Sequence, residues 1–281
     1  MDEMEKIALG YLPARLGEAV RRCAGQDKIA EIRLRAGGLL TLTVGGTNRS
    51  SGVWCTSSDV AETVENLCGG SLYAYAESIR DGVITTEAGI RAGVAGRAVL
   101  EDGKITAVRD VSSVNLRIPH RIPGAADAIL NPVRRGESLL LCSPPGLGKT
   151  TALRELIVRL TSANELRRVA VIDTRYELGA GVRDAVTADF YRGWPRAEGM
   201  EAAVRTMAPE ILVCDEIAGE EDCAALRNVR AAGITVAVSA HAGNENALRR
   251  NRAIAGLLDE GIFDCLAFLG ADRRIEVRRL A

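Results

Sequence analysis

The sequence of 281 residues is poor in aromatic side chains and contains no long apolar run. Only 4% of its residues are Phe, Trp or Tyr, so its cores must be built from Ala, Val, Ile and Leu. No apolar run approaches the roughly 18–20 residues that a membrane-spanning helix needs. The seven cysteines form no CxxC pair, which argues against a zinc site and against a disulfide framework. We expect them to be small core residues in a reducing compartment.

The charge balance is nearly neutral, with 36 basic and 37 acidic side chains and a formal net charge of −1. Such a balance gives no global attraction for nucleic acid or anionic lipid. Hydrophobic residues make up 47% of the chain, which is enough for a sizeable core and excludes disorder for most of it. The N-terminus lacks the basic start and apolar stretch of a signal peptide. We therefore expect a cytoplasmic protein of about two domains.

The first half, residues 1–121, has the pattern of a small α+β domain. Helices are predicted over residues 3–23, 58–67 and 72–80, with Ser58 as the N-cap of the second. Strands are predicted over residues 29–35, 39–44, 83–86, 89–100, 104–109 and 111–118, and the turn at residues 101–103 predicts a hairpin. Residues 119–124 (PHRIPG) form the expected linker, because two prolines and a glycine break regular structure.

The second half, residues 122–281, alternates short apolar strands with helices. The strands are expected at residues 138–142, 168–172, 210–214 and 234–239, and the helices at residues 149–160 and 220–231. This alternation predicts an α/β domain whose mostly parallel sheet is covered on both faces. Residues 263–269 and 273–279 are expected to add an edge hairpin.

A phosphate-binding loop is the most informative feature. The segment SPPGLGKTT fits the pattern GxxxxGK[ST] at every defined position except the first, where Ser143 replaces glycine and would be strained at a positive φ. The glycines let backbone N–H groups surround a phosphate at a helix N-terminus. Lys149 supplies charge for the β- and γ-phosphates, and Thr150 a hydroxyl for Mg²⁺. The expected nucleotide-binding residues are Ser143, Pro144, Pro145, Gly146, Leu147, Gly148, Lys149, Thr150 and Thr151.

Carboxylates follow two of the predicted strands. Asp215 and Glu216 come after residues 210–214, and ligands bind at the carboxyl ends of strands in open parallel sheets. We expect Asp215 to join Thr150 in holding Mg²⁺, and Glu216 to polarise the attacking water as a general base. Asp173 and Glu177 follow residues 168–172, near the same edge, where they could instead bind the linker or an adjacent subunit.

One histidine also reaches this edge. His241 follows the strand predicted at residues 234–239 and either senses the γ-phosphate or is structural. With Lys149 and Glu216 it completes the set of expected catalytic residues, and the paired acids at residues 215 and 216 favour hydrolysis over mere nucleotide storage.

Several segments together resemble the stage III sporulation protein AA family of secretion-type ATPases. They are SPPGLGKTT, VIDTRYELG, GWPRAEGM, APEILVCDEI and AVSAHAG in the second half, and AEIRLRAGG, DGVITTEAGIRAGVAGRAVLEDGKI and VSSVNLRIPHRIPG in the first. The resemblance implies a RecA-like P-loop ATPase core that uses ATP and Mg²⁺. By the same resemblance, Asp173 and Glu177 correspond to the acidic box and His241 to the histidine box, while Thr174 and Tyr176 replace the usual Glu and Ser.

The resemblance also implies a setting. Such an ATPase acts in the cytoplasm of the mother cell, is recruited to the membrane by membrane proteins of a sporulation channel complex, and powers or assembles that complex during endospore formation. Related motors are hexameric rings with nucleotide between subunits. An arginine delivered in trans accelerates phosphoryl transfer, and the segments ahead of or within the linker offer four candidates: Arg91, Arg97, Arg117 and Arg121.

Two other functions stay open. A nucleic-acid-dependent ATPase would need a basic, aromatic-rich face, against which the neutral charge and the scarcity of aromatic residues argue. A nucleotide-binding scaffold would bind ATP and scarcely turn it over.

Overall fold

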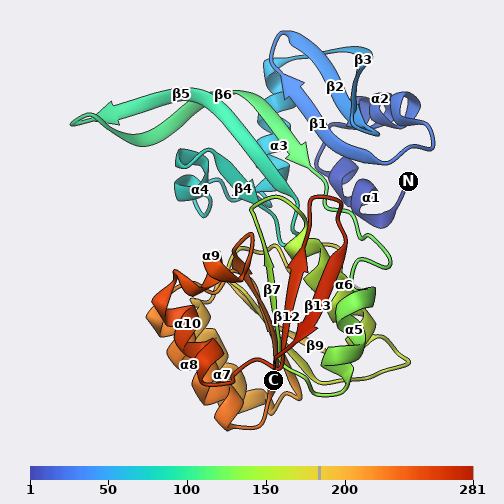
Figure 1. The fold of residues 1–281 in the computed structure, drawn as a ribbon. Helices are drawn as coiled ribbons and strands as arrows, with labels where there is room; N and C mark the ends of the chain where they lie inside the picture. Colours follow the sequence, from blue (N-terminus) through green and yellow to red (C-terminus); the bar gives the residue numbers. More distant parts are fainter. Residues whose placement is uncertain (183–184, 281) are drawn as a thin grey trace. The chain divides into compact units, whose positions relative to one another are not determined.

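The computed structural model describes residues 1–182 and 185–280. The chain divides into two compact units, Met1–His120 and Arg121–Ala281. Figure 1 shows both as ribbons. The assignment of residues 1–121 and 122–281 as separate domains stays a prediction. Within the described residues, no helix has the length and apolar character that crossing a membrane requires.

Six antiparallel strands form the sheet of the first unit, in the order β3-β2-β1-β6-β5-β4 (Figure 1). Their bounds are β1 Ile29–Arg35, β2 Gly38–Val44, β3 Thr47–Cys55, β4 Val83–Thr85, β5 Arg91–Glu101 and β6 Lys104–Arg117. The helices are α1 Glu3–Gly10, α2 Ala14–Ala24, α3 Ser57–Leu67 and α4 Ala76–Arg80.

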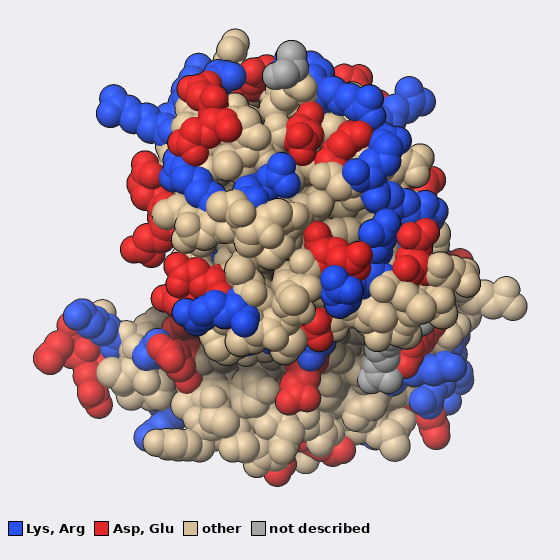
Figure 2. Space-filling view, turned by 90° about the horizontal axis from the view of Figure 1, so that it is seen from below, with Lys and Arg blue, Asp and Glu red and all other residues tan. Residues whose placement is uncertain are grey.

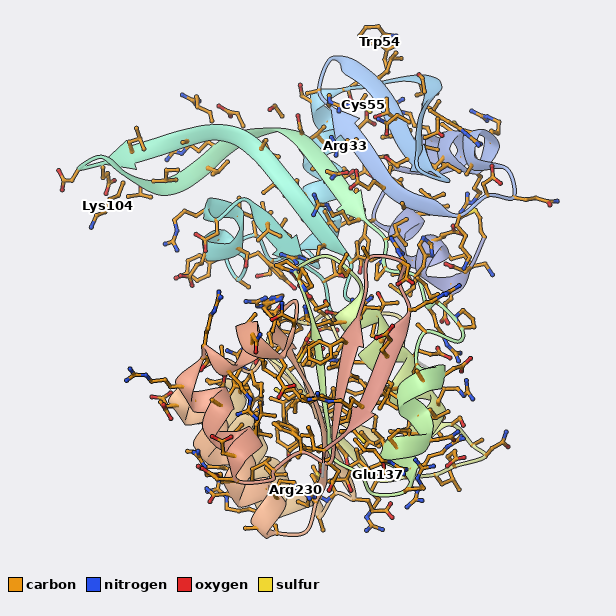
Figure 3. The ribbon with its side chains drawn as sticks, in the orientation of Figure 1. Arg33, Trp54, Cys55, Lys104, Glu137 and Arg230 are labelled. Carbon is orange, nitrogen blue, oxygen red and sulfur yellow. The ribbon has the colours of Figure 1, made fainter. Side chains whose placement is uncertain are left out.

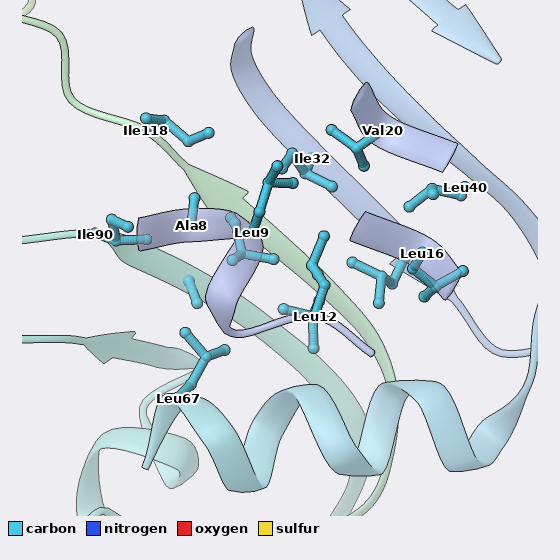
Figure 4. Packing of buried hydrophobic residues seen from close by; sticks show 14 of the residues in the cluster. Ala8, Leu9, Leu12, Leu16, Val20, Ile32, Leu40, Leu67, Ile90 and Ile118 are labelled. Carbon is cyan, nitrogen blue, oxygen red and sulfur yellow. The ribbon is translucent and has the colours of Figure 1, made fainter. Parts of the chain in front are cut away.

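The core of this unit lies between the sheet and helices α1 to α3. Along β1, Ile32 and Leu34 are buried while Arg33 and Arg35 are exposed, as expected for a strand with one wet face. Figure 4 shows Leu9 of α1 beside Ile32, and Leu16 of α2 toward Leu40 in the same core. Apolar burial at this scale is the main stabilising term of the unit.

Several predictions for this unit are wrong in detail. The single helix predicted over residues 3–23 is two helices, because Pro13 lacks an N–H and becomes the N-cap of α2. The N-cap of α3 is Thr56, not Ser58: Thr56 Oγ1 accepts the N–H of Asp59 at 3.2 Å, and the Asp59 carboxylate accepts the N–H of Thr56 at 2.6 Å. Strand β3 is not predicted, and the helix predicted from residue 72 begins only at Ala76.

Strands β5 and β6 form a long hairpin, whose projecting part, residues 97–109, is called the arm below (Figure 1). Its turn has φ of 50° at Asp102 and 74° at Gly103, so the hairpin predicted at residues 101–103 is confirmed. Figure 3 shows Lys104 at its free end. The two segments predicted on either side of Asp110 are one strand, in which Asp110 has a positive φ of 49°.

The second unit contains a seven-stranded sheet in the order β13-β12-β7-β11-β10-β8-β9, parallel except for β13. The strands are β7 Leu139–Ser143, β8 Val169–Asp173, β9 Ala188–Arg192, β10 Ile211–Cys214, β11 Thr235–His241, β12 Cys265–Leu269 and β13 Ile275–Arg279. The predicted mostly parallel sheet and the predicted edge hairpin are both confirmed.

Helices cover both faces of this sheet. Their bounds are α5 Asp127–Arg134, α6 Lys149–Thr161, α7 Arg196–Met207, α8 Glu220–Ala231, α9 Glu245–Arg249 and α10 Arg252–Asp259. Helices α5 and α6 lie on one face and α7, α8 and α10 on the other, each group with its own apolar core (Figure 1). Strand β9 and helices α5, α7, α9 and α10 are not predicted from the sequence.

The cysteines are core residues, as predicted: six of the seven are buried, and Cys23 is half-buried. Within the described residues all seven are free thiols. Burial raises the pKa of Cys142 to about 12 and that of Cys223 to about 11. Thiols in this state are poor nucleophiles, because the thiolate is the reactive form.

Candidate functional site

The parallel strands of the second unit bring the expected site residues to one edge of the sheet. The four strands that carry these residues lie side by side in the order β7, β11, β10 and β8. In the pairing of β11 with β7, His241 stands opposite Ser143. Because parallel strands all end at the same edge, Ser143, Asp173, Asp215 and His241 gather there. Their sequence motifs are far apart, and the strand order joins them.

The phosphate loop leaves β7 and opens helix α6. Gly146 has φ of 78° and Gly148 has φ of 115°, both in the region that favours glycine. Ser143 is not among the residues with positive φ, so its replacement of glycine brings no backbone strain. The backbone N–H groups of residues 146–150 have no acceptor within the part of the chain that the structure describes. Such a row of unpaired donors at a helix N-terminus fits a phosphate group.

The side chain of Lys149 lies in this loop and is only 5% exposed. Its Nζ donates to the carbonyl oxygens of Ser143 at 3.0 Å and Pro144 at 3.3 Å, and it lies 2.9 Å from His241 Nδ1. Burial lowers the pKa of Lys149, and the charges of Asp215 and Glu216 oppose that effect only in part. The ammonium group is therefore paired mainly with neutral acceptors, for which an anionic phosphate is a stronger substitute.

Asp215 is held by two hydroxyl groups. Thr150 Oγ1 donates to its Oδ2 at 2.7 Å, and Ser239 Oγ donates to its Oδ1. The buried Ser239 hydroxyl also accepts the N–H of Glu216 at 3.1 Å. A hydroxyl and a carboxylate in contact are oxygen ligands of the type that Mg²⁺ prefers, so Thr150 and Asp215 fit a magnesium ion.

Glu216 is engaged through both carboxylate oxygens. Its Oε1 lies 3.0 Å from His241 Nε2, and its Oε2 pairs with Arg175 Nη1. An ammonium group can only donate, so contact with Lys149 assigns His241 a neutral ring with the proton on Nε2. Lys149, His241, Glu216 and Arg175 thus form a continuous chain of polar contacts. Glu216 also has a positive φ of 55°, an unusual backbone state for a residue other than glycine.

The second pair of acids lies at the end of β8, with Asp173, and in the loop after it, with Glu177. The buried carboxylate of Asp173 accepts the N–H groups of Glu177 at 2.8 Å, Leu178 at 3.1 Å and Gly179 at 2.7 Å. Arg154 Nε donates to the Glu177 carbonyl at 2.5 Å. Burial lowers the pKa of Arg154, while the carboxylates around it, Glu177 first, oppose this. Asp173 therefore holds the shape of the loop that carries Glu177 and Arg175.

Two cavities adjoin these acids. One of about 10 Å³ is lined by residues at the end of β8, in the loop after β8 and directly after β10, among them Asp173, Glu177, Asp215 and Glu216. Its size is close to that of one water molecule. A larger one of about 390 Å³ has Glu216 and His241 on its wall, and Arg175 and Arg196 line both cavities.

Four residues of this site are missing from the site residues predicted from the sequence: Arg154, Arg175, Arg196 and Ser239. Ser239 contributes through its contacts with Asp215 and Glu216. Arg175 and Arg196 do lie within the two segments VIDTRYELG and GWPRAEGM that carry the family resemblance. That placement is the signal that could have found them, because positions inside a matched segment are candidates for the site. Ser239 likewise lies within the matched segment AVSAHAG, whereas Arg154 lies outside all the matched segments.

Among the candidate trans arginines, Arg97, Arg117 and Arg121 have partners inside their own units. Arg91, Arg97 and Arg117 belong to the first unit, where Arg97 pairs with Asp110 at 2.6 Å and Arg117 with Glu31 at 3.4 Å. Arg121 belongs to the second unit, where its Nε donates to the buried Glu155 at 2.7 Å. Delivery of any of them in trans stays a prediction.

Comparison with known proteins shows the family to which this chain is similar. Residues 5–278 match the family described as "Sporulation stage III, protein AA". The chain is 30% identical over 278 residues to the Stage III sporulation protein AA of Bacillus subtilis (strain 168), covering 94% of this chain and 89% of that protein.

Solved structures agree on the fold. The ATPase DotB of Legionella pneumophila has a TM-score of 0.61 at 16% identity, over 95% of this chain and 80% of that one. The pilus retraction motor PilT has a TM-score of 0.59 at 16% identity, over 100% and 83% of the two chains. These likenesses show a RecA-like secretion-ATPase fold. By the family match and the relative from Bacillus subtilis, the chain belongs to the stage III sporulation protein AA family.

Proposed function

We propose that this chain binds ATP with Mg²⁺ at its phosphate loop and hydrolyses it, as a secretion-type ATPase of endospore formation. One observation carries the proposal: Lys149 and Thr150, adjacent at the start of α6, contact His241 and Asp215 at the ends of two other strands. A phosphate-binding element, a metal-binding pair and a second carboxylate at residue 216 thus meet at one sheet edge. This is the set of parts that phosphoryl transfer to water requires.

The residues have distinct tasks in this proposal. The N–H groups of residues 146–150 and the ammonium group of Lys149 bind the β- and γ-phosphates, and Lys149 gives up its contacts with neutral carbonyls to do so. Thr150 and Asp215 would hold Mg²⁺, which neutralises charge on the phosphates. Glu216 accepts the proton of the attacking water, and His241 lies beside it where the γ-phosphate would end.

Binding and turnover are measured together to test this. Calorimetry with ATP and Mg²⁺ gives affinity, and phosphate release gives turnover. We expect Lys149→Ala to lose binding, and Glu216→Gln to keep binding and lose turnover. Arg205→Ala, which removes an exposed arginine on α7, is the control. Failure of the unaltered protein to bind ATP with Mg²⁺ would refute the proposal.

The proposed assembly is a hexameric ring that works with membrane proteins of a sporulation channel complex, in the cytoplasm of the mother cell. Family membership and the fold shared with DotB and PilT support it. Light scattering of Glu216→Gln with and without ATP measures the particle mass. Fractionation of sporulating cells, with and without the channel genes, measures recruitment to the membrane. A monomer at all nucleotide concentrations would contradict the ring.

A scaffold with little turnover is the second candidate, and one observation favours it. Both oxygens of Glu216 are engaged, by His241 and Arg175, which leaves the base occupied. Equal phosphate release by the unaltered protein and Glu216→Gln would support the scaffold. The nucleic-acid alternative gains no support from Figure 2, where acidic and basic side chains are interspersed over the face displayed. Stimulation of turnover by single-stranded nucleic acid would revive it.

A further inference from the structure

We propose that Arg175 is a positioning residue that restrains the Glu216 carboxylate, and that this restraint remains after a triphosphate in the phosphate loop has freed His241. The inference rests on the proposed function, because it assigns the regulation of the same site. It concerns a residue outside the phosphate loop, the metal-binding pair and the acid pair of Asp173 and Glu177.

The first step is the occupancy of the Glu216 carboxylate. A general base must offer an oxygen to water within hydrogen-bonding reach. Here Oε1 faces His241 Nε2 at 3.0 Å and Oε2 faces the guanidinium group of Arg175. The Glu216 side chain is 22% exposed, so water reaches the pair, but the guanidinium group occupies one of the acceptor sites of Oε2 that water would otherwise use.

The second step is that the backbone of Glu216 offers no other route. Its N–H donates to Ser239 Oγ at 3.1 Å, and the next N–H, of Ile217, donates to Ser239 O at 2.9 Å. Its positive φ of 55° is a conformation that persists only where the surroundings impose it. The carboxylate can therefore change partners by side-chain rotation, while its main chain stays in place.

The third step links these contacts to the phosphate loop. Lys149 Nζ lies 2.9 Å from His241 Nδ1, and the same ring donates from Nε2 to Glu216. An ammonium group binds an anionic phosphate more strongly than a neutral ring nitrogen. When Lys149 turns to the phosphate, His241 loses its donor and its ring is free to reorient. The contact of Glu216 with His241 thus depends on phosphate through Lys149, which leaves Arg175 as the remaining restraint.

The fourth step is the placement of Arg175. It lies in the loop that Asp173 holds through three backbone N–H groups, so its starting point is rigid. Its side chain is 60% exposed, and ion pairs this exposed are weak and exchangeable. Arg196 lines the same cavities but is paired with Asp222 at 3.0 Å. Among the described residues, Arg175 is the arginine that reaches Glu216.

Turnover of variants at residue 175 tests the restraint. We expect Arg175→Ala to raise kcat of the isolated protein by up to about fivefold, the factor that an exposed ion pair represents, with KM for ATP unchanged. Arg175→Lys, which keeps a cation, should remain near the unaltered protein, and Arg205→Ala is the matched control. The double variant Arg175→Ala/Glu216→Gln should show no turnover, because the gain passes through Glu216. An unchanged or lower kcat, or a change confined to KM, would overturn the proposal.

A second measurement follows the link through His241 without relying on turnover. The chain has only two histidines, so ring ¹⁵N signals are assigned by the loss of one set in His241→Asn. We expect the Nδ1 signal of His241 to shift on adding Mg²⁺ with a non-hydrolysable ATP analogue, and to be shifted already in nucleotide-free Lys149→Ala. No shift at saturating analogue would refute the link. Absence of any analogue binding by calorimetry would instead refute the proposed function.

Discussion

Thr150 Oγ1 donates a hydrogen bond of 2.7 Å to Asp215 Oδ2, which joins the first turn of α6 to the end of β10 across 65 positions of sequence. In the sequence the two residues belong to separate motifs. Their contact shows that strand order, with β11 between β7 and β10, still leaves the loop after β7 within reach of the carboxylate after β10. A hydroxyl and a carboxylate held together are a preformed pair of oxygen ligands.

Removal of this hydroxyl should separate metal-dependent from metal-independent nucleotide binding. We expect Thr150→Ala to weaken ATP binding about 10–100-fold when Mg²⁺ is present, the range found when groups around a metal are removed. With the metal chelated, binding should change little. Thr150→Ser keeps the hydroxyl and serves as control. Calorimetry under both conditions checks this, and an equal loss with and without Mg²⁺ would show that Thr150 does not act through the metal.

Lys149 should lower the stability of the nucleotide-free fold while enabling binding. Its ammonium group is buried, and burial lowers its pKa below the ordinary 10.5. Methionine is similar in shape and carries no charge. We expect Lys149→Met to unfold at a higher urea concentration, with a free energy of unfolding that is larger by about 0.5–2 kcal/mol. Unlike the unaltered protein, it should gain no stability from ATP with Mg²⁺.

The gain in stability of Lys149→Met over the unaltered protein should depend on pH. Between the lowered pKa of folded Lys149 and 10.5, the unfolded chain binds more protons than the folded one, so the stability of the unaltered protein rises with pH. The gap to Lys149→Met should therefore narrow from pH 7 toward pH 10.5. Urea unfolding at several pH values measures it, and a gap that widens would contradict the assignment.

Asp173 should matter for the shape of its loop more than for its charge. Its buried carboxylate accepts three backbone N–H groups, and an amide would turn an NH₂ group toward at least one of them. We expect Asp173→Asn to destabilise the second unit by about 1–3 kcal/mol. Asp189→Asn, at an exposed position of β9, should change little. Urea unfolding compares them, and equal stabilities would show that the three contacts are dispensable.

The cap of α3 should give the first unit a distinct acid sensitivity. Burial raises the pKa of Asp59, but the hydroxyl and N–H of Thr56 and the guanidinium group of Arg15 outweigh it, and the net pKa lies below 3.8. The stability that Asp59 contributes is therefore present above pH 3.8 and is lost as the pH falls through the lower folded pKa. We expect Asp59→Asn to be less stable by about 1–3 kcal/mol at pH 7 and to approach the unaltered protein below pH 3.8. Glu62→Gln, exposed on the same helix, is the control, and a gap that persists in acid would contradict this origin.

Local patterns predict most of the second unit's strands and the phosphate loop, because each is an uninterrupted apolar run or a spacing of a few residues. They fail where tertiary contacts decide. Thr56 and Ser58 are both good caps by residue type, and the contact of Asp59 with Arg15 stabilises the box that Thr56 forms. Strand β3 is mostly exposed and has no clear alternation, so its pairing with β2 is invisible in the sequence.

In the candidate site, too, local patterns predict some of the residues, while tertiary contacts decide the others. Lys149, Thr150, Asp215 and Glu216 stand in recognisable patterns, and the structure brings them to one edge. The contacts of Ser239 with Asp215 and Glu216 depend on β11 lying next to β10. That neighbour relation is a property of sheet topology, and single-sequence periodicity carries no information about it.

Gly96 lies where the register of β5 against β6 shifts, and it should determine whether the two strands stay paired in the arm. A methyl group at this position would lie 2.7 Å from the Arg109 carbonyl oxygen and 2.9 Å from Val111 Cα, so β6 would have to move away. Gly93, on the same strand, has its nearest such neighbour at 4.0 Å, and Gly93→Ala is the matched control. Overpacking of this kind typically costs about 1–3 kcal/mol.

Because the arm is mostly exposed, this change should appear as local opening, while the urea midpoint moves little. We expect amide hydrogen exchange at residues 97–109 to become faster in Gly96→Ala and to stay unchanged in Gly93→Ala. Protection of the amides in β1 and β2 should be the same in both variants, since their pairing does not involve residue 96. Equal exchange of the arm in the two variants would mean that β6 relaxes without loss of pairing, and that the close approach at Gly96 does not stabilise the pairing of the arm.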